Sequence, residues 1–202
     1  MKVVLASGNK GKLKEFNQLL NPLDIEVLPQ SAFNISSVEE TGLTFVENAI
    51  LKARYASKIS GLPAIADDSG LEVDALNGAP GIYSARYAGE DATDALNNQK
   101  LLTDLQGVET HKRTARFQCL LVFLEHPSDP TPVICQGSWE GLILESPSGD
   151  QGFGYDPLFW VPSKACASAE LSKDEKNSLS HRGKALRKLI SKLSVSHSLS
   201  AK

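Results

Sequence analysis

Two pairs of neighbouring acidic residues could hold a metal ion, Glu39-Glu40 and Asp67-Asp68. The aspartates come at the end of the apolar run PAIA (63–66), and adjacent carboxylates repel each other unless a cation, a cap or water receives them. In an extended segment neighbouring side chains point to opposite faces, so only one of the aspartates would enter a given site directly. One or two carboxylates, with phosphate oxygens and water, are the usual ligands of Mg²⁺. The pairs therefore suit a magnesium site, and the alternative is that the glutamates are solvated and the aspartates cap a turn.

A glycine-containing loop with two lysines, SGNKGK at residues 7–12, lies between a short apolar run and a segment with helical periodicity. Free N–H groups and the positive end of the dipole at a helix N-terminus favour a phosphate there, and a solvated tight turn is the alternative. The loop is not a Walker A motif, because its glycines are too close together and Leu13 stands where that motif needs Ser or Thr. A phosphate bound here would need its metal ion to be held from elsewhere.

Two further stretches could recognise a nucleobase. The loop GDQGFGYDP (149–157) has glycines that let the backbone approach a ligand, and Phe153 and Tyr155 offer aromatic faces for stacking. Its spacing does not fit a dinucleotide-binding fingerprint, and a packed turn is the alternative. In Ser180-His181-Arg182, the arginine presents only hydrogen-bond donors, so it could pair with a purine keto oxygen and would face a donor in the amino group of adenine. A solvated helix cap is the alternative for this block.

The elements that must position these residues follow from hydrophobic periodicity, turn residues and two capping boxes, Thr44-x-x-Glu47 and Ser172-x-x-Glu175. Strands are predicted at residues 2–6, 25–29 and 63–66, with alternation continuing through Leu71 and Val73, and as a long antiparallel pair at 115–125 and 132–145. Helices are predicted from the loop at 7–12 to Asn21, from Thr44 to Gly61 and near 94–105. A helical region is predicted from Ser172 through Leu193, and its last helix starts at Ser180-His181-Arg182. The sequence thus predicts a mixed α/β fold with helices around a sheet.

Composition limits the class of protein. The chain has 202 residues, 41% of them hydrophobic, which is enough for a sizeable core in one large domain or two small lobes. The formal charge of −3 gives no basic field for nucleic acid or a membrane surface, so neither is expected as a partner. Three scattered cysteines without a CxxC pair, and the lack of a signal peptide or a long apolar run, lead us to expect a cytoplasmic protein with reduced thiols.

Five blocks in a fixed order resemble the inosine/xanthosine triphosphate pyrophosphatase family, and the bacterial enzymes that clear deaminated purine nucleotides above all. The blocks are SGNKGKLKE, EETGLTFVENAILKA, ADDSGLEVDALNGAPGIYSARYAG, FGYDPLF and SHRGKAL. The similarity covers roughly residues 1 to 193, and five ordered blocks are far more specific than any one of them.

The resemblance implies a role for each matched residue. The triphosphate would be cradled by Ser7, Gly8, Asn9, Lys10, Gly11 and Lys12, with Lys12 as its main cation. Glu39 or Glu40, which spacing does not separate, would hold Mg²⁺ together with Asp68, which would also be the proton acceptor. Ser69 would contact the substrate, Phe153 would stack on the base within Phe153, Gly154, Tyr155 and Asp156, and the pocket would be completed by Lys176, His181 and Arg182, which would read the 6-keto group.

The implied reaction is attack of an activated water on the α-phosphorus of ITP, dITP or XTP, giving a nucleoside monophosphate and pyrophosphate. Mg²⁺ would neutralise phosphate charge and Lys12 would add electrostatic stabilisation. The implied fold is an elongated α/β structure with a mixed sheet, flanking helices and two lobes with the active site in the cleft between them, and the implied assembly is a homodimer. Residues 1–193 would form this domain and residues 194–202 a polar C-terminal tail.

Two other functions remain open. A pyrophosphatase of the Maf type would act on modified pyrimidine or other nucleotides, and the Ser180-His181-Arg182 block and the 149–157 loop argue against it. A regulatory module would bind purine triphosphates without hydrolysing them. The presence of Asp68 together with Lys12 argues against that module, because binding alone does not need a residue that activates water.

Overall fold

The computed structural model describes the backbone of residues 1–200 and the side chains of residues 1–194. The chain divides into two compact units. The first unit contains Met1–Asp68, Leu120–Gln136 and the chain from Ala185 onward, and the second contains Ser69–Cys119 and Gly137–Lys184. No helix in the described part of the chain is long and apolar enough to cross a membrane.

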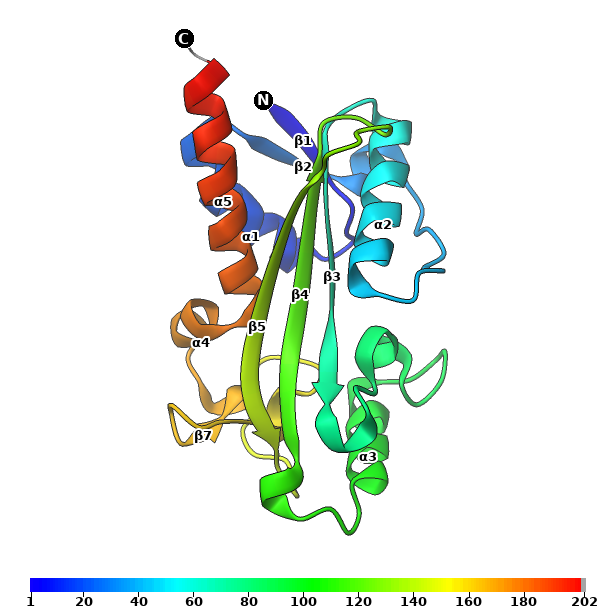
Figure 1. Ribbon diagram of the computed structural model, residues 1–202, viewed down its shortest axis with the longest axis vertical. Helices are drawn as coiled ribbons and strands as arrows, with labels where there is room; N and C mark the ends of the chain where they lie inside the picture. The colour runs from blue at the N-terminus through cyan, green and yellow to red at the C-terminus, as the bar shows by residue number, and fades with distance from the viewer. Residues whose placement is uncertain (201–202) are drawn as a thin grey trace. The chain divides into compact units, whose positions relative to one another are not determined.

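The described residues form a seven-stranded mixed sheet in the order β2-β1-β3-β4-β5-β6-β7 (Figure 1). Its strands are β1 (Lys2–Leu5), β2 (Glu26–Pro29), β3 (Ala64–Val73), β4 (Thr114–Leu124), β5 (Val133–Ile143), β6 (Phe159–Val161) and β7 (Cys166–Ala167). β1 is parallel to both β2 and β3, whereas β6 is antiparallel to β5 and to β7. The mixed α/β fold predicted from the sequence is confirmed, including the long neighbouring strands β4 and β5.

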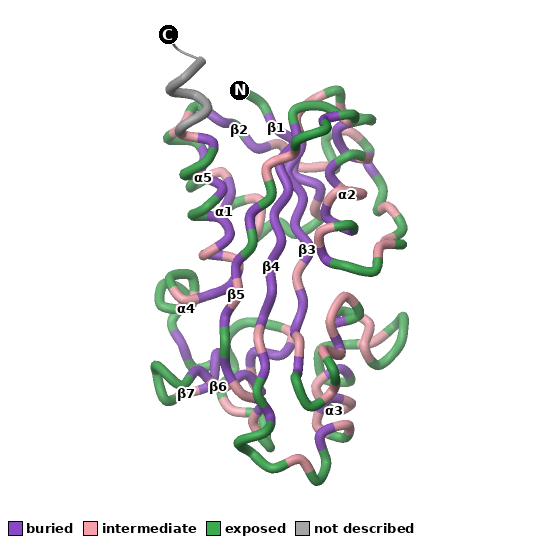
Figure 2. Tube along the Cα trace, viewed as in Figure 1, coloured by how far each residue is buried: buried purple, intermediate pink, exposed green. Residues whose placement is uncertain are grey.

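The helices are α1 (Lys10–Leu20), α2 (Phe45–Ser60), α3 (Asp94–Asp104), α4 (Lys173–Leu179) and α5 (His181–Ser200). In the first unit α2 packs an alanine face, Ala49, Ala53 and Ala56, against apolar residues of β1, β3 and β4. These alanines recur at helical spacing and are fully buried, so one face of α2 lies close to the sheet. Figure 2 shows the buried central strands, which fix the backbone from which the site residues project.

The second unit is built around an aromatic cluster. Phe117 of β4 lies 4.5 Å from Phe159 and 6.3 Å from Trp139 between ring centroids, and the Trp139 and Phe159 rings are 5.1 Å apart. Leu101 and Leu105, from α3 and its end, join the same core. This core supports the loop at residues 149–157.

One boundary differs from the sequence prediction. The aspartates do not end a strand: β3 continues through Asp67 and Asp68 to Val73, because ion pairs with lysines compensate the buried carboxylates. The predicted start of the last helix at Ser180-His181-Arg182 is confirmed, because Ser180 is extended with ψ 155° and α5 begins at His181. The predicted tail, 194–202, lies largely outside the described side chains, although the backbone of α5 is described to Ser200.

Candidate active site

The 7–12 loop is shaped by the cap of α1. Asn9 is extended, and its side-chain oxygen accepts hydrogen bonds from the backbone N–H groups of Gly11 at 2.8 Å and Lys12 at 3.1 Å. Ser7 Oγ accepts from the N–H of Asn9 at 3.2 Å. A Cβ on Gly11 would lie 3.1 Å from this capping oxygen, so glycine leaves room for the cap. The sequence places Lys12 on the first turn of α1, and its ammonium reaches β3.

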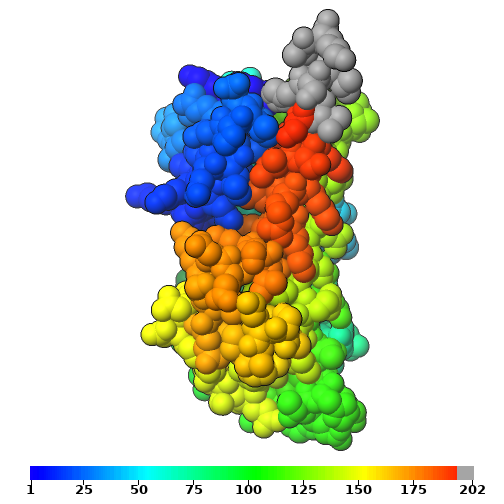
Figure 3. All heavy atoms as spheres, turned by 90° about the vertical axis from the view of Figure 1, so that its left-hand side faces the viewer, coloured from blue at the N-terminus to red at the C-terminus, as the bar shows by residue number. Residues whose placement is uncertain are grey.

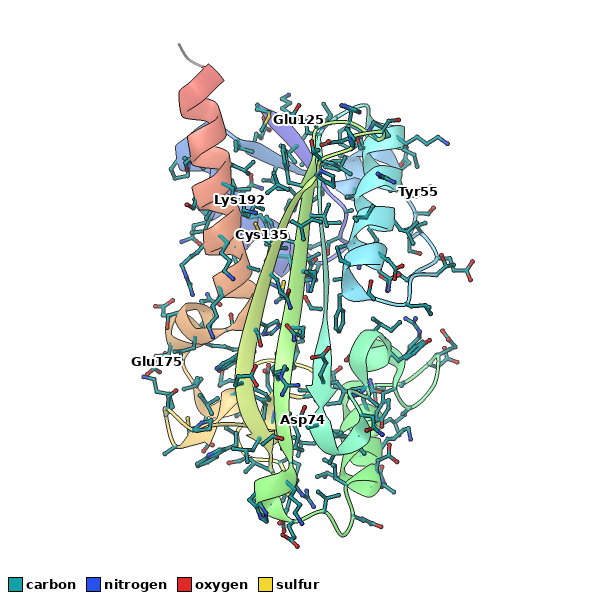
Figure 4. The ribbon with its side chains drawn as sticks, in the orientation of Figure 1. Tyr55, Asp74, Glu125, Cys135, Glu175 and Lys192 are labelled. Atoms are coloured by element: carbon teal, nitrogen blue, oxygen red, sulfur yellow. The ribbon has the colours of Figure 1, made fainter. Side chains whose placement is uncertain are left out.

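A pocket of about 220 Å³ in the first unit gathers several of the predicted residues. Its lining includes Ser7, Gly8 and Lys12 from the 7–12 loop, Glu40 from the segment before α2, and Lys52, Tyr55 and Asp67 from α2 and β3. Figure 4 shows Tyr55 on α2. The pocket therefore combines two lysines with two carboxylates beside the N-terminal turn of α1, which suits a polyanion accompanied by a cation.

Lys12 forms an ion pair with Asp67 rather than with Asp68. The Lys12 Nζ lies 2.6 Å from Asp67 Oδ2, and only 1% of the Asp67 side chain is exposed. Successive residues of β3 alternate between its faces, so the neighbouring aspartates have different partners. Asp67 thus holds the lysine that the sequence predicts to bind the triphosphate.

Asp68 and Glu40 share a single cation. Lys52 Nζ lies 2.8 Å from Asp68 Oδ1 and 2.9 Å from Glu40 Oε1, and only 16% of the lysine side chain is exposed. The pKa of Asp68 is raised above its usual value, mainly because the carboxylate is buried. The charge and hydrogen bond of Lys52 lower this pKa, and the negative charges of Glu40 and Asp67 raise it further. For Lys52, burial lowers the pKa, but Asp68 and Glu40 outweigh burial and the pKa is raised.

The oxygen atoms of Asp68 and Glu40 are the kind of ligand that a magnesium ion takes. Asp68 Oδ2 is buried and has no hydrogen-bond partner in the described part of the chain, so one carboxylate oxygen is left to receive a ligand. Glu40 converges with Asp68 on the same ammonium, whereas Glu39 is exposed. Among the described residues no group of three or more His, Cys, Asp or Glu could hold a metal ion. Two carboxylates suit Mg²⁺, whose remaining ligands are commonly water and phosphate oxygens.

The second unit contains the predicted base-binding residues. Phe153 is 60% exposed, and Lys176 Nζ lies 5.1 Å and the Arg182 guanidinium carbon 6.0 Å from the centre of its ring. An exposed ring bordered by two cations can stack on an electron-rich base. His181 opens α5 and stacks on Phe117, with ring centroids 4.9 Å apart and an interplanar angle of 16°. Ser69, the first residue of this unit, is half-buried in β3.

Asp156 organises the loop instead of facing solvent. It is only 3% exposed, and its carboxylate accepts from the Phe153 N–H at 2.8 Å, from Ser168 Oγ at 2.9 Å and from the Lys176 ammonium. Gly152 has φ +84°, and a Cβ there would collide with this carboxylate. The loop is therefore folded around a buried negative charge.

The prediction that Tyr155 offers an aromatic face is wrong. Tyr155 is 5% exposed and belongs to the second unit's core, where its hydroxyl donates to the Ser84 carbonyl at 2.7 Å. The sequence could not distinguish the two loop aromatics, because the burial of each depends on contacts with segments distant in the chain.

Sequence reasoning missed Lys52 and the role of Asp67 as the partner of Lys12. A signal for Lys52 existed: it is a lysine on a helix whose neighbours Ala49, Ala53 and Ala56 mark the buried face, so its stem had to lie at the border of that face. Nothing in the sequence indicated which carboxylates its ammonium would meet.

Comparison with known proteins finds relatives that match the chain over nearly its full length. The chain is 63% identical over 192 residues to the dITP/XTP pyrophosphatase of Photobacterium profundum, covering 95% of this chain and 98% of the relative. It is 57% identical over 192 residues, with the same coverage, to the dITP/XTP pyrophosphatase of Escherichia coli (strain K12). A solved structure of a HAM1 protein from Coxiella burnetii superimposes with a TM-score of 0.93 at 52% identity, over 96% of this chain and 98% of that one.

The family model described as the Ham1 family matches residues 3–192. This match covers the five sequence blocks and both units, and it confirms the resemblance found in the sequence. The chain belongs to the Ham1 family.

Proposed function

We propose that this protein hydrolyses deaminated purine nucleoside triphosphates, ITP, dITP and XTP, to the nucleoside monophosphate and pyrophosphate, and so removes them from the nucleotide pool. The observation that carries the proposal is the sequence identity of 57% and 63% to two dITP/XTP pyrophosphatases, over 95% of this chain. The first unit of the chain also gathers Lys12, Lys52, Glu40 and Asp68 in one region.

At the phosphate end, the N-terminal turn of α1 and Lys12 bind the triphosphate. The lysine ammonium offsets negative charge that develops on the leaving pyrophosphate as the bond from the α-phosphorus to the bridging oxygen breaks. Its ion pair with Asp67 keeps the ammonium at the pocket before the substrate arrives. Lys12 therefore acts by electrostatics and needs no proton transfer.

Asp68 accepts the proton of the attacking water while the new oxygen–phosphorus bond forms. Burial raises the pKa of this carboxylate in the metal-free protein. Glu40 and Asp68 would hold Mg²⁺, which when bound neutralises phosphate charge and makes the phosphorus more electrophilic. Lys52 holds these two carboxylates together when the ion is absent.

At the base end, Phe153 stacks on the purine and Arg182 donates to its 6-keto oxygen. Adenine carries an amino donor at that position, so two donors would face each other and ATP is disfavoured. Lys176 and His181 complete this end. Residues proposed for the phosphates lie in the first unit and those proposed for the base lie in the second.

The test is pyrophosphate release from ITP, dITP, XTP, ATP and a modified pyrimidine triphosphate, each with Mg²⁺ and with EDTA. We expect strong release from the deaminated purine nucleotides with Mg²⁺, and release from ATP lower by at least about 100-fold, the discrimination that mismatched polar groups can supply. Release from the pyrimidine alone would favour an enzyme of the Maf type. Binding of ITP without pyrophosphate would favour the regulatory module.

We further propose a cytoplasmic homodimer that needs neither nucleic acid nor a membrane. The formal charge of −3 supports the absence of a general nucleic-acid surface. Sedimentation of the purified protein at enzyme-assay concentration would test the dimer, and a single monomer boundary would contradict it.

A further inference from the structure

The N-terminal half of α3 holds the backbone of the base-binding loop. Asp94 Oδ2 accepts a hydrogen bond from the Gly154 N–H at 2.7 Å, and Asn98 Nδ2 donates to the Gly154 carbonyl at 2.8 Å. The backbone N–H and the carbonyl of Gly154 are therefore both hydrogen-bonded, by two side chains that lie one helical turn apart on α3. Asn98 also donates to the Asp94 carbonyl at 2.9 Å, which fixes its own orientation.

The contacts with Gly154 complete a clamp around Phe153. The Phe153 N–H donates to the buried Asp156 carboxylate on one side, and the next residue, Gly154, is held by α3 on the other. The Phe153 ring is 60% exposed, so core packing does not fix its direction. Gly154 has φ +61°, a conformation that favours glycine, and the clamp selects this state from the many that glycine can adopt.

The hydrogen bond to Asp94 is not needed to bury a polar group. It lies in an exposed environment, where water could take the place of the carboxylate at little cost. Its consequence is geometric: it limits the directions in which the exposed ring can point. A ring held in its bound orientation loses less conformational freedom when a base stacks on it.

We propose that Asp94 and Asn98 are positioning residues for base recognition, acting through Gly154 on the orientation of Phe153. The inference rests on the proposed function for the identity of the base, a purine, while the clamp itself acts on whatever planar group stacks on Phe153. Neither residue needs to contact the substrate. The triphosphate alone should not depend on them, because the predicted phosphate residues belong to the first unit.

The test compares dITP with inorganic tripolyphosphate, which has the charge of the triphosphate and no base. Dissociation constants for both are measured by calorimetry in EDTA, where hydrolysis is suppressed, and kcat and KM for dITP are measured with Mg²⁺. The variants are Asp94→Ala, which removes the acceptor, and Asn98→Asp, which replaces the donor with an acceptor of the same size. Asp94→Asn retains an acceptor oxygen, and Gln99→Ala changes an exposed neighbour on α3.

We expect Asp94→Ala and Asn98→Asp to weaken dITP binding and to raise KM roughly tenfold, within the worth of one base–aromatic stack. The affinity for tripolyphosphate and kcat at saturation should stay within about twofold of wild type. The variants lose a contact with the base that is equally strong in the bound substrate and in the transition state, so KM changes and kcat does not. Asp94→Asn should recover most of the dITP affinity, and Gln99→Ala should match wild type.

Equal losses for dITP and tripolyphosphate would overturn the inference, because the effect would then be a general disturbance of the protein. Unchanged dITP binding in both variants would overturn it as well. If wild type binds dITP but releases no pyrophosphate, the proposed function fails while the binding comparison still decides the role of the clamp. Far-UV circular dichroism of each variant checks that it is folded.

Discussion

Lys52 carries a positive charge at the point where two carboxylates of the first unit meet. Its ammonium lies within 2.9 Å of both Glu40 and Asp68, and all three side chains are at least three-quarters buried. Charges withdrawn from water are tolerated only when paired, so each of the three depends on the others. In this geometry a divalent cation could bind Glu40 and Asp68 and compensate their negative charges in place of the Lys52 ammonium.

Lys52→Met should therefore destabilise the protein and make its stability depend on Mg²⁺. In EDTA we expect the free energy of unfolding to fall by about 3 kcal/mol, because the variant leaves two buried carboxylates without a cation. Millimolar Mg²⁺ should restore part of this loss, and urea denaturation with and without the ion measures both effects. Lys58→Met, on an exposed position of α2, is the matched control. Equal stability of the two variants would show that Lys52 does not compensate the carboxylates.

At the scale of elements, helix starts follow from local chemistry. Thr44 caps α2, where its hydroxyl accepts from the Glu47 N–H at 3.3 Å, and Ser172 caps α4 in a reciprocal capping box with Glu175. Gly61, with φ +68°, ends α2. These signals involve residues three or four positions apart, which is why the sequence predicts them.

Glu175 should give the protein a stability that disappears in acid. The hydrogen bond from Lys164, followed by those from Ser172, lowers the pKa of Glu175 from 4.5 to about 2. The Glu175 side chain lies on the outside of α4 (Figure 4). A carboxylate whose folded pKa is depressed stabilises the fold above its unfolded pKa, and the contribution is lost as the pH falls from 4.5 toward 2. Glu175→Ala should therefore melt below wild type at pH 7, with a difference that shrinks toward pH 2.

The control for Glu175→Ala is Asp174→Asn, which removes a charge from the same first turn of α4 without touching the capping box. Thermal unfolding across this pH range compares the two variants with wild type. A melting difference for Glu175→Ala that stays constant with pH would contradict the role of its charge.

Three lysines of α5 cover one edge of β5. The ammonium groups of Lys184, Lys188 and Lys192 donate to the carbonyls of Ser138, Gln136 and Ile134 at 2.8, 2.7 and 3.0 Å. The lysines are four residues apart, a rise of about 6 Å along the helix, which nearly matches the length of about 6.8 Å of two strand residues, so successive lysines meet every second carbonyl. β6 pairs with β5 at Leu142 and Ile143, beyond this stretch, so the lysines cover an edge that a foreign strand could otherwise join.

Figure 3 shows the part of α5 before residue 195 at the surface. Lys192 lies near Cys135 in the groove between α5 and β5 (Figure 4). Lys188→Met should keep the aliphatic stem in this groove and lose the hydrogen bond. We expect a loss of about 0.5 to 1 kcal/mol in the free energy of unfolding and stronger self-association by light scattering. Lys14→Met, an exposed position on α1 with the same change in charge, should do neither. Equal behaviour of the two variants would argue against a protective role for the lysines.

At the scale of the whole molecule, β3 carries the chain from one unit to the other within the acidic stretch. Asp68 is the last residue of the first unit's opening segment, and Ser69 begins the second unit. Residues proposed for the chemistry of the α-phosphorus and residues proposed for the base therefore belong to different packing environments. Their substitutions should affect different kinetic constants.

Asp68→Asn should lower kcat by about 10² to 10⁴, because it removes the proton acceptor and a charged ligand of the proposed Mg²⁺ while preserving shape. Phe153→Ala should instead raise KM roughly tenfold at nearly unchanged kcat, because it removes the stacking face. Steady-state kinetics and dITP binding measure both, and Tyr83→Ala, another exposed aromatic of the second unit, is the control. A large loss of kcat in Phe153→Ala would mean that the base end also orients the α-phosphorus.

The sequence by itself determined the class of fold, most element boundaries, the family and the blocks in which the site residues occur. It could do so because caps, turns and hydrophobic periods are local, and because five ordered blocks form a specific pattern. Only the tertiary structure decided that Lys12 pairs with Asp67, that Lys52 joins Glu40 to Asp68, and that Tyr155 is buried while Phe153 is exposed. These outcomes depend on which distant segments meet across the sheet and on how burial shifts the balance between charged groups, and neither is encoded in the spacing of residues along the chain.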